Sequence, residues 1–195
     1  MKNNITIYGF GYVGRAVFNF LKDHFGVSIH DPAGLNGFIL QSPHLFFQKF
    51  NEVKETDLAI ICVPTQMRED GSCDTKIVED VVKNSKHSHY LIKSTVVPGT
   101  TARLAKETGK NITFSPEYIG EGNYSVPHWK GYPHPTDMKL HDFHIFGGER
   151  KTVGEWVGVW QKVAGWAPKY VQTDSTTAEI VKYAEYSYLA TQKMF

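Results

Sequence analysis

Two glutamates four residues apart follow a short apolar run in the segment SPEYIGEG, residues 115–122. The preceding run, NITFSP, has the composition of a buried strand, and open α/β sheets place their ligands at the carboxyl ends of parallel strands. We therefore expect Glu117 and Glu121 to lie in one crevice. One of the two carboxylates would stay ionised there, as a general base or a group that orients water. The alternative interpretation is a solvated acidic loop.

A second group of residues could hold phosphates. Gly9, Gly11 and Gly14 form the pattern G-x-G-x-x-G between an apolar run and a helical pattern, where the glycines permit a tight turn, close approach of a pyrophosphate and close helix packing. Asp31 follows about 20 residues after Gly11, where a carboxylate accepts both ribose hydroxyls and repels a 2′-phosphate. The pattern predicts NAD rather than NADP, and the alternative is a plain turn with a surface aspartate.

The elements that must position these residues alternate along the chain. Strands are predicted at residues 4–9, 27–31, 57–64, 89–95, 111–116, 142–148 and 169–174, and helices at 12–25, 74–85 with an N-capping Asp74, 99–109, around Trp156 and Trp160, and 176–195. Strands that alternate with helices predict an α/β protein with a doubly wound, mostly parallel, Rossmann-like sheet. The apolar residues of the helix at 74–85 are Ile77, Val78, Val81 and Val82. The last helix is amphipathic, with Ile180, Tyr183, Ala184 and Ser187 near one helical face.

Composition narrows the class of protein. The 195 residues carry 21 basic and 20 acidic side chains without a run of one sign, so neither nucleic acid nor an anionic membrane is an expected partner. No apolar run suggests a membrane span or a signal peptide, and two cysteines make no disulfide framework, which favours a cytoplasmic location. Cys62 is expected to be a small buried side chain and Cys73 a solvent-side thiol. The loop histidines have no zinc spacing, so no metal is expected; they are His128, His134, His141 and His144. Aromatic residues of the same loop could stack on a base or sugar or simply pack; they are Tyr124, Trp129 and Tyr132.

Six segments in unbroken order resemble the nucleotide-sugar dehydrogenases, the family of UDP-glucose 6-dehydrogenase and GDP-mannose dehydrogenase. They are GFGYVG, ICVPTQMREDGSCD, IKSTVVPGTT, FSPEYIGEG, FGG and TDSTTAEIVKYAEYSYLAT. The resemblance implies an NAD-dependent oxidoreductase that converts the C6 alcohol of a nucleotide sugar into a carboxylate through an aldehyde and a cysteine-bound thioester. UDP-glucose is the first expected substrate, which implies a place in nucleotide-sugar metabolism and polysaccharide biosynthesis.

The resemblance also assigns roles to residues. It implies that Lys182 stabilises the developing alkoxide, that Thr95 positions water and cofactor, and that Glu117 and Glu121 lie against the sugar. A solvated helix lysine and a plain strand threonine are the alternatives for Lys182 and Thr95. The residues expected to bind the cofactor are Gly9, Gly11, Tyr12, Val13, Gly14, Asp31, Val63, Pro64, Thr65, Ser94 and Thr95.

The chain departs from the family in three places. Tyr186 stands where the family has an asparagine beside the lysine, and Gly120 stands where it has a bulky or basic residue. No segment matches the family's second domain with its nucleophilic cysteine. We expect an NAD-binding domain at residues 1–173, the start of the linking helix at 174–195, and either a homodimer through this helix or completion by a missing C-terminal half. The alternative is a catalytically inactive NAD(H)-binding module with a binding or regulatory role.

Overall fold

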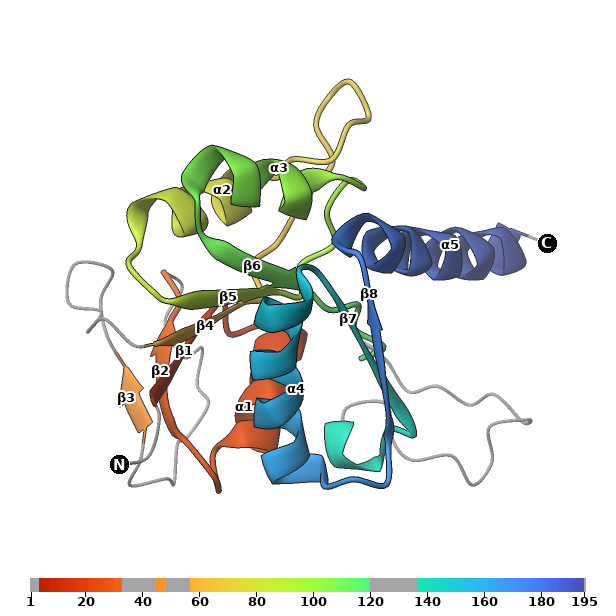
Figure 1. Ribbon diagram of the computed structural model, residues 1–195. Helices are drawn as coiled ribbons and strands as arrows, with labels where there is room; N and C mark the ends of the chain where they lie inside the picture. Colours follow the sequence, from red (N-terminus) through yellow and green to blue (C-terminus); the bar gives the residue numbers. More distant parts are fainter. Residues whose placement is uncertain (1–3, 33–44, 48–56, 120–136, 195) are drawn as a thin grey trace.

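The computed structural model describes residues 4–32, 45–47, 57–119 and 137–194, and all statements below concern these ranges (Figure 1). Their strands join in one eight-stranded sheet in the order β3-β2-β1-β4-β5-β6-β7-β8. The strands are β1 (Asn4–Tyr8), β2 (Gly26–His30), β3 (Leu45–Phe47), β4 (Leu58–Ile61), β5 (His89–Ile92), β6 (Asn111–Phe114), β7 (Phe143–Gly147) and β8 (Lys169–Thr173). No helix in these ranges is both long and apolar enough to cross a bilayer.

Helices cover both faces of the sheet, as Figure 1 shows. Two of them, α1 (Tyr12–Leu21) and α4 (Arg150–Ala164), lie on one face, and α2 (Lys76–Asn84) and α3 (Thr100–Thr108) lie on the other. A short 3-10 helix, η3 (Met138–Leu140), precedes β7. The strand order reverses between β1 and β4, and such a switch point opens a crevice at the carboxyl ends of the strands. The predicted doubly wound, mostly parallel fold is confirmed.

The sheet separates two apolar cores. Ile5, Ile7 and Leu91 point to the face that α1 and α4 cover, where Trp156 and Trp160 are fully buried. Tyr8, Ala59 and Ile61 point to the opposite face, against α2 and α3. This arrangement follows from strand geometry, because successive side chains of a strand alternate between faces. Both faces are covered, which explains why the central strands are apolar without interruption.

Several local predictions differ from the structure. β3 was not predicted, and β7 pairs antiparallel with β6. The first helix ends at Leu21. Thr75 is the N-cap of α2, while Asp74 stands one residue earlier and accepts the Lys76 N–H at 2.9 Å. Ile77, predicted to be in the apolar face of α2, is 47% exposed because that helix buries its other valine-bearing side.

The last helix, α5 (Ser175–Met194), buries charged side chains beside the apolar Ala178. Ile180, which was grouped with Ala184 and Ser187 near one helical face, is exposed, and so are these two residues. Glu179 is fully buried and Lys182 is nearly so. The grouping of these residues on one face does not show which side of the helix is buried, because hydrogen bonds decide that here. Beyond Glu185, the helix extends away from the sheet with its described side chains exposed (Figure 1).

Glu179 caps a different helix from its own. One carboxylate oxygen accepts the N–H of Gly99 at 2.6 Å, and the other accepts the N–H and the hydroxyl of Thr101 at 2.8 and 2.6 Å. The N-terminal N–H groups of α3 have no intrahelical partner and carry a partial positive charge, so a carboxylate stabilises them. Burial raises the pKa of Glu179, while these hydrogen bonds act in the opposite direction.

We expect Glu179→Ala to lower the free energy of unfolding by about 3 kcal/mol, because it removes charge-assisted hydrogen bonds and leaves buried donors without a partner. Urea denaturation followed by circular dichroism measures this change. Glu155→Ala is the control, since Glu155 is exposed on α4, and its effect should stay within about 0.5 kcal/mol. Equal stability of the two variants would contradict the capping role.

Candidate active site

The glycine turn between β1 and α1 is shaped by close backbone contacts. Gly9 has φ +89°, and a Cβ there would lie 2.5 Å from the carbonyl oxygen of Cys62. A Cβ on Gly14 would lie 2.0 Å from the carbonyl oxygen of Gly9, so only glycine lets α1 approach the turn. A Cβ on Gly11, in contrast, would meet no atom within 4 Å among the described residues beyond its own chain neighbours. The first and third glycines therefore serve packing, and the second keeps an open approach to the helix N-terminus.

The turn has the features of a dinucleotide site. The helix α1 begins after Gly11 without a side-chain cap and without an acidic residue in its first turn, so its N–H groups can receive phosphate oxygens. Asp31 directly follows β2, and its Oδ2 accepts the backbone N–H of Phe10 at 2.6 Å. This bond fixes the carboxylate beside the turn, where it can receive ribose hydroxyls. Tyr12 is largely exposed at the start of α1, and Val13 is half-buried against the core. These residues fit NAD.

The segments after β4 and β5 are tied together by side-chain hydroxyls. Thr65 Oγ1 donates to the carbonyl oxygen of Thr95 at 2.6 Å, and Ser94 Oγ donates to the carbonyl oxygen of Val63 at 2.7 Å. Pro64 between them is exposed. Because β4 and β5 are adjacent parallel strands, these residues line the same carboxyl edge as the glycine turn.

Neither of the two cysteines is an exposed thiol. Cys62 is half-buried and packs against the core, and burial raises the pKa of its thiol to about 12. Cys73 was expected on the solvent side, but it is also half-buried, with Sγ 3.7 Å from the Thr95 carbonyl oxygen. A thiol with so high a pKa as that of Cys62 is a weak nucleophile at neutral pH.

Glu117 and Lys182 meet beyond the end of β6, although 65 residues separate them. The Lys182 Nζ lies 3.1 Å from Glu117 Oε1, and it donates to the Glu117 carbonyl oxygen at 2.7 Å. The other carboxylate oxygen, Oε2, accepts the N–H of Ile119 at 2.8 Å. The two side chains are only 12% and 10% exposed, so little solvent screens this pair. Lys182 is therefore not a solvated helix lysine.

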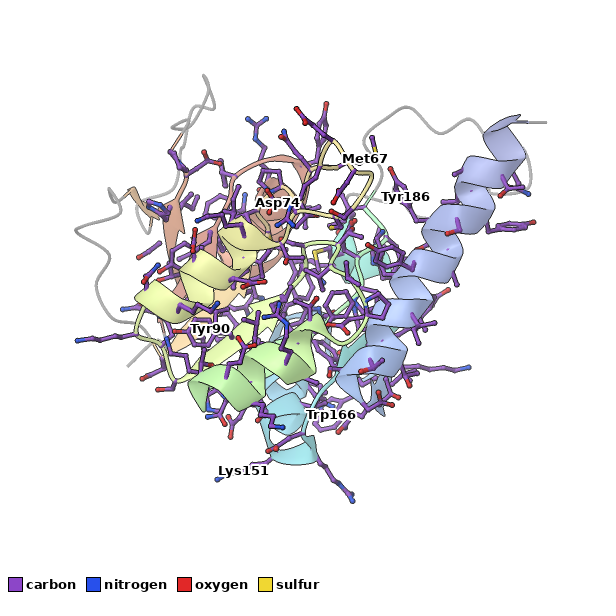
Figure 2. The ribbon with its side chains drawn as sticks, turned by 90° about the horizontal axis from the view of Figure 1, so that it is seen from above. Met67, Asp74, Tyr90, Lys151, Trp166 and Tyr186 are labelled. Carbon is purple, nitrogen blue, oxygen red and sulfur yellow. The ribbon has the colours of Figure 1, made fainter. Side chains whose placement is uncertain are left out.

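A second carboxylate comes from α5 itself. Glu185 Oε2 lies 3.9 Å from Lys182 Nζ, and burial raises the pKa of Glu185 while Lys182 acts in the opposite direction. The sequence pattern did not single out Glu185. Glu121, which was expected as the second carboxylate, lies outside the described residues, as do Gly120 and the aromatic and histidine residues between 124 and 134. Tyr186 is 64% exposed and projects from α5 in Figure 2.

A buried lysine that the sequence prediction missed lies behind this pair. Lys93 follows β5 and is 4% exposed, with Nζ 3.2 Å from Ser115 Oγ and 5.6 Å from the centre of the Trp160 ring. Burial lowers the pKa of Lys93 to about 8. Of the loop histidines, His144 is buried, and burial lowers its pKa to about 3, so its ring is neutral at physiological pH. No three histidine, cysteine or carboxylate side chains gather for a metal in the described ranges.

The reversal of the strand order at β1 and β4, the glycine turn and Asp31 define an NAD-binding domain of the Rossmann type. Residues 31–127 match the model of the UDP-glucose/GDP-mannose dehydrogenase family, NAD binding domain. The chain belongs to this family.

Curated relatives agree with this assignment. A putative UDP-glucose 6-dehydrogenase from Bacillus subtilis is 29% identical over 87% of this chain, and a UDP-glucose 6-dehydrogenase from Rickettsia prowazekii is 31% identical over 80%. The chain spans only 40% and 37% of the length of these two relatives. Their activity and substrates therefore concern longer proteins.

Solved structures show the same fold. A UDP-D-ManNAc dehydrogenase from Pyrococcus horikoshii superposes with a TM-score of 0.74 at 20% identity, covering 95% of this chain and 50% of that one. A UDP-glucose dehydrogenase from Pyrobaculum islandicum gives a TM-score of 0.70 at 24% identity, covering 97% of this chain and 50% of that one.

Proposed function

We propose that this chain is the cofactor-binding part of an NAD-dependent nucleotide-sugar 6-dehydrogenase, with UDP-glucose as the first candidate substrate. The observation that carries the proposal is the buried Lys182 and Glu117 pair at the same sheet edge as the glycine turn. Residues 1–173 would form the NAD-binding domain, and 174–195 would begin the helix that leads to a nucleotide-sugar domain or to a second copy. The exposed second half of α5 supports this division.

The roles of the residues follow from their charges. Bound NAD supplies the acceptor for the hydride that leaves C6 of the sugar. Lys182 would donate a hydrogen bond to the sugar O6 and stabilise the negative charge that develops there, because a cation preorganised in a dry site is effective in the transition state. Glu117 holds the ammonium through its side chain and its carbonyl oxygen, and would take up or orient the proton released from O6.

The second oxidation, from aldehyde to acid, would need a thiol nucleophile. Cys62 does not supply it, because burial raises the pKa of its thiol to about 12 and its side chain packs in the core. We propose that this nucleophile lies in residues outside this chain, as the resemblance to the family implies. Thr95 and its bond with Thr65 would hold the edge of the crevice at the cofactor.

The cofactor part of the proposal has its own prediction. Asp31→Ala should weaken NAD binding roughly tenfold, since charge-assisted hydrogen bonds to ribose hydroxyls are lost. NADP binding should not weaken, because the variant removes the carboxylate that repels a 2′-phosphate. Titration calorimetry with both dinucleotides measures the two constants, and Asp80→Ala on the exposed side of α2 is the control. An equal loss for NAD and NADP would contradict the role of Asp31.

The test of the function is NADH formation with a panel of UDP-sugars and GDP-sugars. Turnover with NAD and a UDP-sugar supports the dehydrogenase. NAD binding without turnover by this chain, combined with turnover when the nucleotide-sugar domain of a relative is added, places the missing groups in that domain. NAD binding without turnover under either condition would favour an NAD(H)-binding module, an alternative that the exposed Tyr186 supports because it leaves the oxyanion without a second donor.

A further inference from the structure

Lys93 is a buried cation without a close carboxylate. Among the described residues no carboxylate oxygen lies within 4 Å of its Nζ, and its two hydrogen bonds go to one residue, the Oγ and carbonyl oxygen of Ser115, at 3.2 and 3.4 Å. An ammonium has three donors, and long bonds to one residue do not satisfy all of them. The ring of Trp160, 5.6 Å from Nζ, adds only a weak attraction.

Keeping a charge at this position costs stability. Burial lowers the pKa of Lys93 to about 8, which means that the folded protein disfavours its charged form. An apolar side chain of similar volume would avoid this cost. Natural sequences break such packing rules mainly at functional sites. Lys93 therefore calls for a role beyond stability.

A small cavity adjoins this lysine. Its volume is about 10 Å³, and its lining includes Lys93, Glu117, His141 and His144. One water molecule needs roughly 10–15 Å³ and two to four polar partners. Polar partners are present, because His144 is neutral and its Nε2 is buried without a hydrogen bond to any described residue.

We propose that a water molecule in this cavity joins the ammonium of Lys93 to the carboxylate of Glu117. Lys93 then positions Glu117 through this water, while Lys182 contacts the same carboxylate directly. His144 Nε2 provides the third partner of the water. Lys93 also fixes the start of the same loop through Ser115, two residues before Glu117. Lys93 is then a positioning residue for the proposed reaction, which it would serve without touching the sugar.

The experiment compares wild-type protein with Lys93→Met and Lys93→Gln by crystallography, thermal unfolding and kinetics with NAD and UDP-glucose. Lys110→Met is the matched control, because Lys110 Nζ also binds backbone carbonyls, those of Val82 and Ser85, but at the C-terminus of α2. We expect Lys93→Met to raise the melting temperature and to lower kcat at least tenfold, with the KM for NAD changed less than twofold. Lys93→Gln keeps a hydrogen-bond donor, so its melting temperature and its kcat should lie between those of the wild type and those of Lys93→Met. Lys110→Met should lower the melting temperature and leave kcat unchanged.

The structures decide the proposal independently of turnover. Electron density for one water within hydrogen-bond distance of Lys93 Nζ and Glu117 supports it, provided that Lys93→Met loses this water and shifts the Glu117 carboxylate. The kinetic part rests on the proposed function. If no nucleotide sugar is turned over by the wild type, that function fails, and the water and the position of Glu117 still test Lys93. An unchanged Glu117 in Lys93→Met, or unchanged kcat in an active enzyme, overturns the proposal.

Discussion

Lys182→Ala should lower kcat for a nucleotide sugar by roughly 100- to 1000-fold, the range found when one preorganised donor to a developing oxyanion is removed. The lysine is almost completely buried and is held by two contacts with Glu117, so its position is fixed before substrate binds. The KM for NAD should change little, because the glycine turn and Asp31 are separate from this pair. Steady-state NADH formation gives kcat when the nucleotide sugar is varied at saturating NAD, and it gives the KM for NAD when NAD is varied at saturating nucleotide sugar.

Two further variants make this result specific. Glu117→Gln should also reduce turnover, and the double variant should lose less than the product of the single losses, since the two residues act as a unit. Lys76→Ala removes an exposed lysine that pairs with Asp80 on α2, and it should leave kcat unchanged. A Lys182→Ala protein that is folded by circular dichroism and turns over within threefold of wild type would exclude Lys182 from the reaction.

Gly14→Ala should destabilise the protein by more than about 3 kcal/mol. The added Cβ would lie 2.0 Å from the Gly9 carbonyl oxygen, and the obstacle is backbone rather than the end of a flexible side chain. Relief requires α1 to move away from β1, and this motion opens the core that buries Val17 and Leu21. Denaturant unfolding should show a lower midpoint.

Gly11→Ala is the contrasting variant at the same turn. In the part of the chain that the structure describes, its Cβ would meet no atom within 4 Å beyond its chain neighbours, and φ at Gly11 is −73°, which alanine adopts easily. The free energy of unfolding should stay within about 0.5 kcal/mol of wild type. NAD affinity should fall at least tenfold, because the methyl group would occupy the approach of the pyrophosphate. Unchanged affinity would show that the dinucleotide does not bind over this turn.

Sequence patterns predicted the fold well because each pattern has a direct geometric cause. A continuous apolar, β-branched run indicates a parallel strand that is buried on both faces, because helices cover both faces of such a sheet. The glycines at 9, 11 and 14 predicted the turn that the structure shows. The placement of Glu117 at the carboxyl end of β6 followed from the same rule. The pairing of Glu117 with Lys182 was not predicted, because no periodicity connects residues so far apart and the family resemblance only gave each of them a role at the sugar.

The sequence did not predict which polar residues the fold buries. Hydropathy treats Lys93, Glu179 and Glu185 as surface residues, because their burial depends on partners that only the folded chain brings near. The buried side of α5 could not be read from the sequence for the same reason. The antiparallel pairing of β7 with β6 could not be predicted either, because the alternation of side chains along a strand does not give the direction of that strand in the sheet.

The two buried charges of α5 lie almost one helical turn apart and hold different parts of the domain: Glu179 holds the N-terminus of α3, and Lys182 holds the loop after β6. The exposed half of the helix, from Tyr186 onward, continues directly from the residues that make these two contacts. A displacement of that exposed half would therefore act on the N-terminus of α3 and on the loop after β6 together.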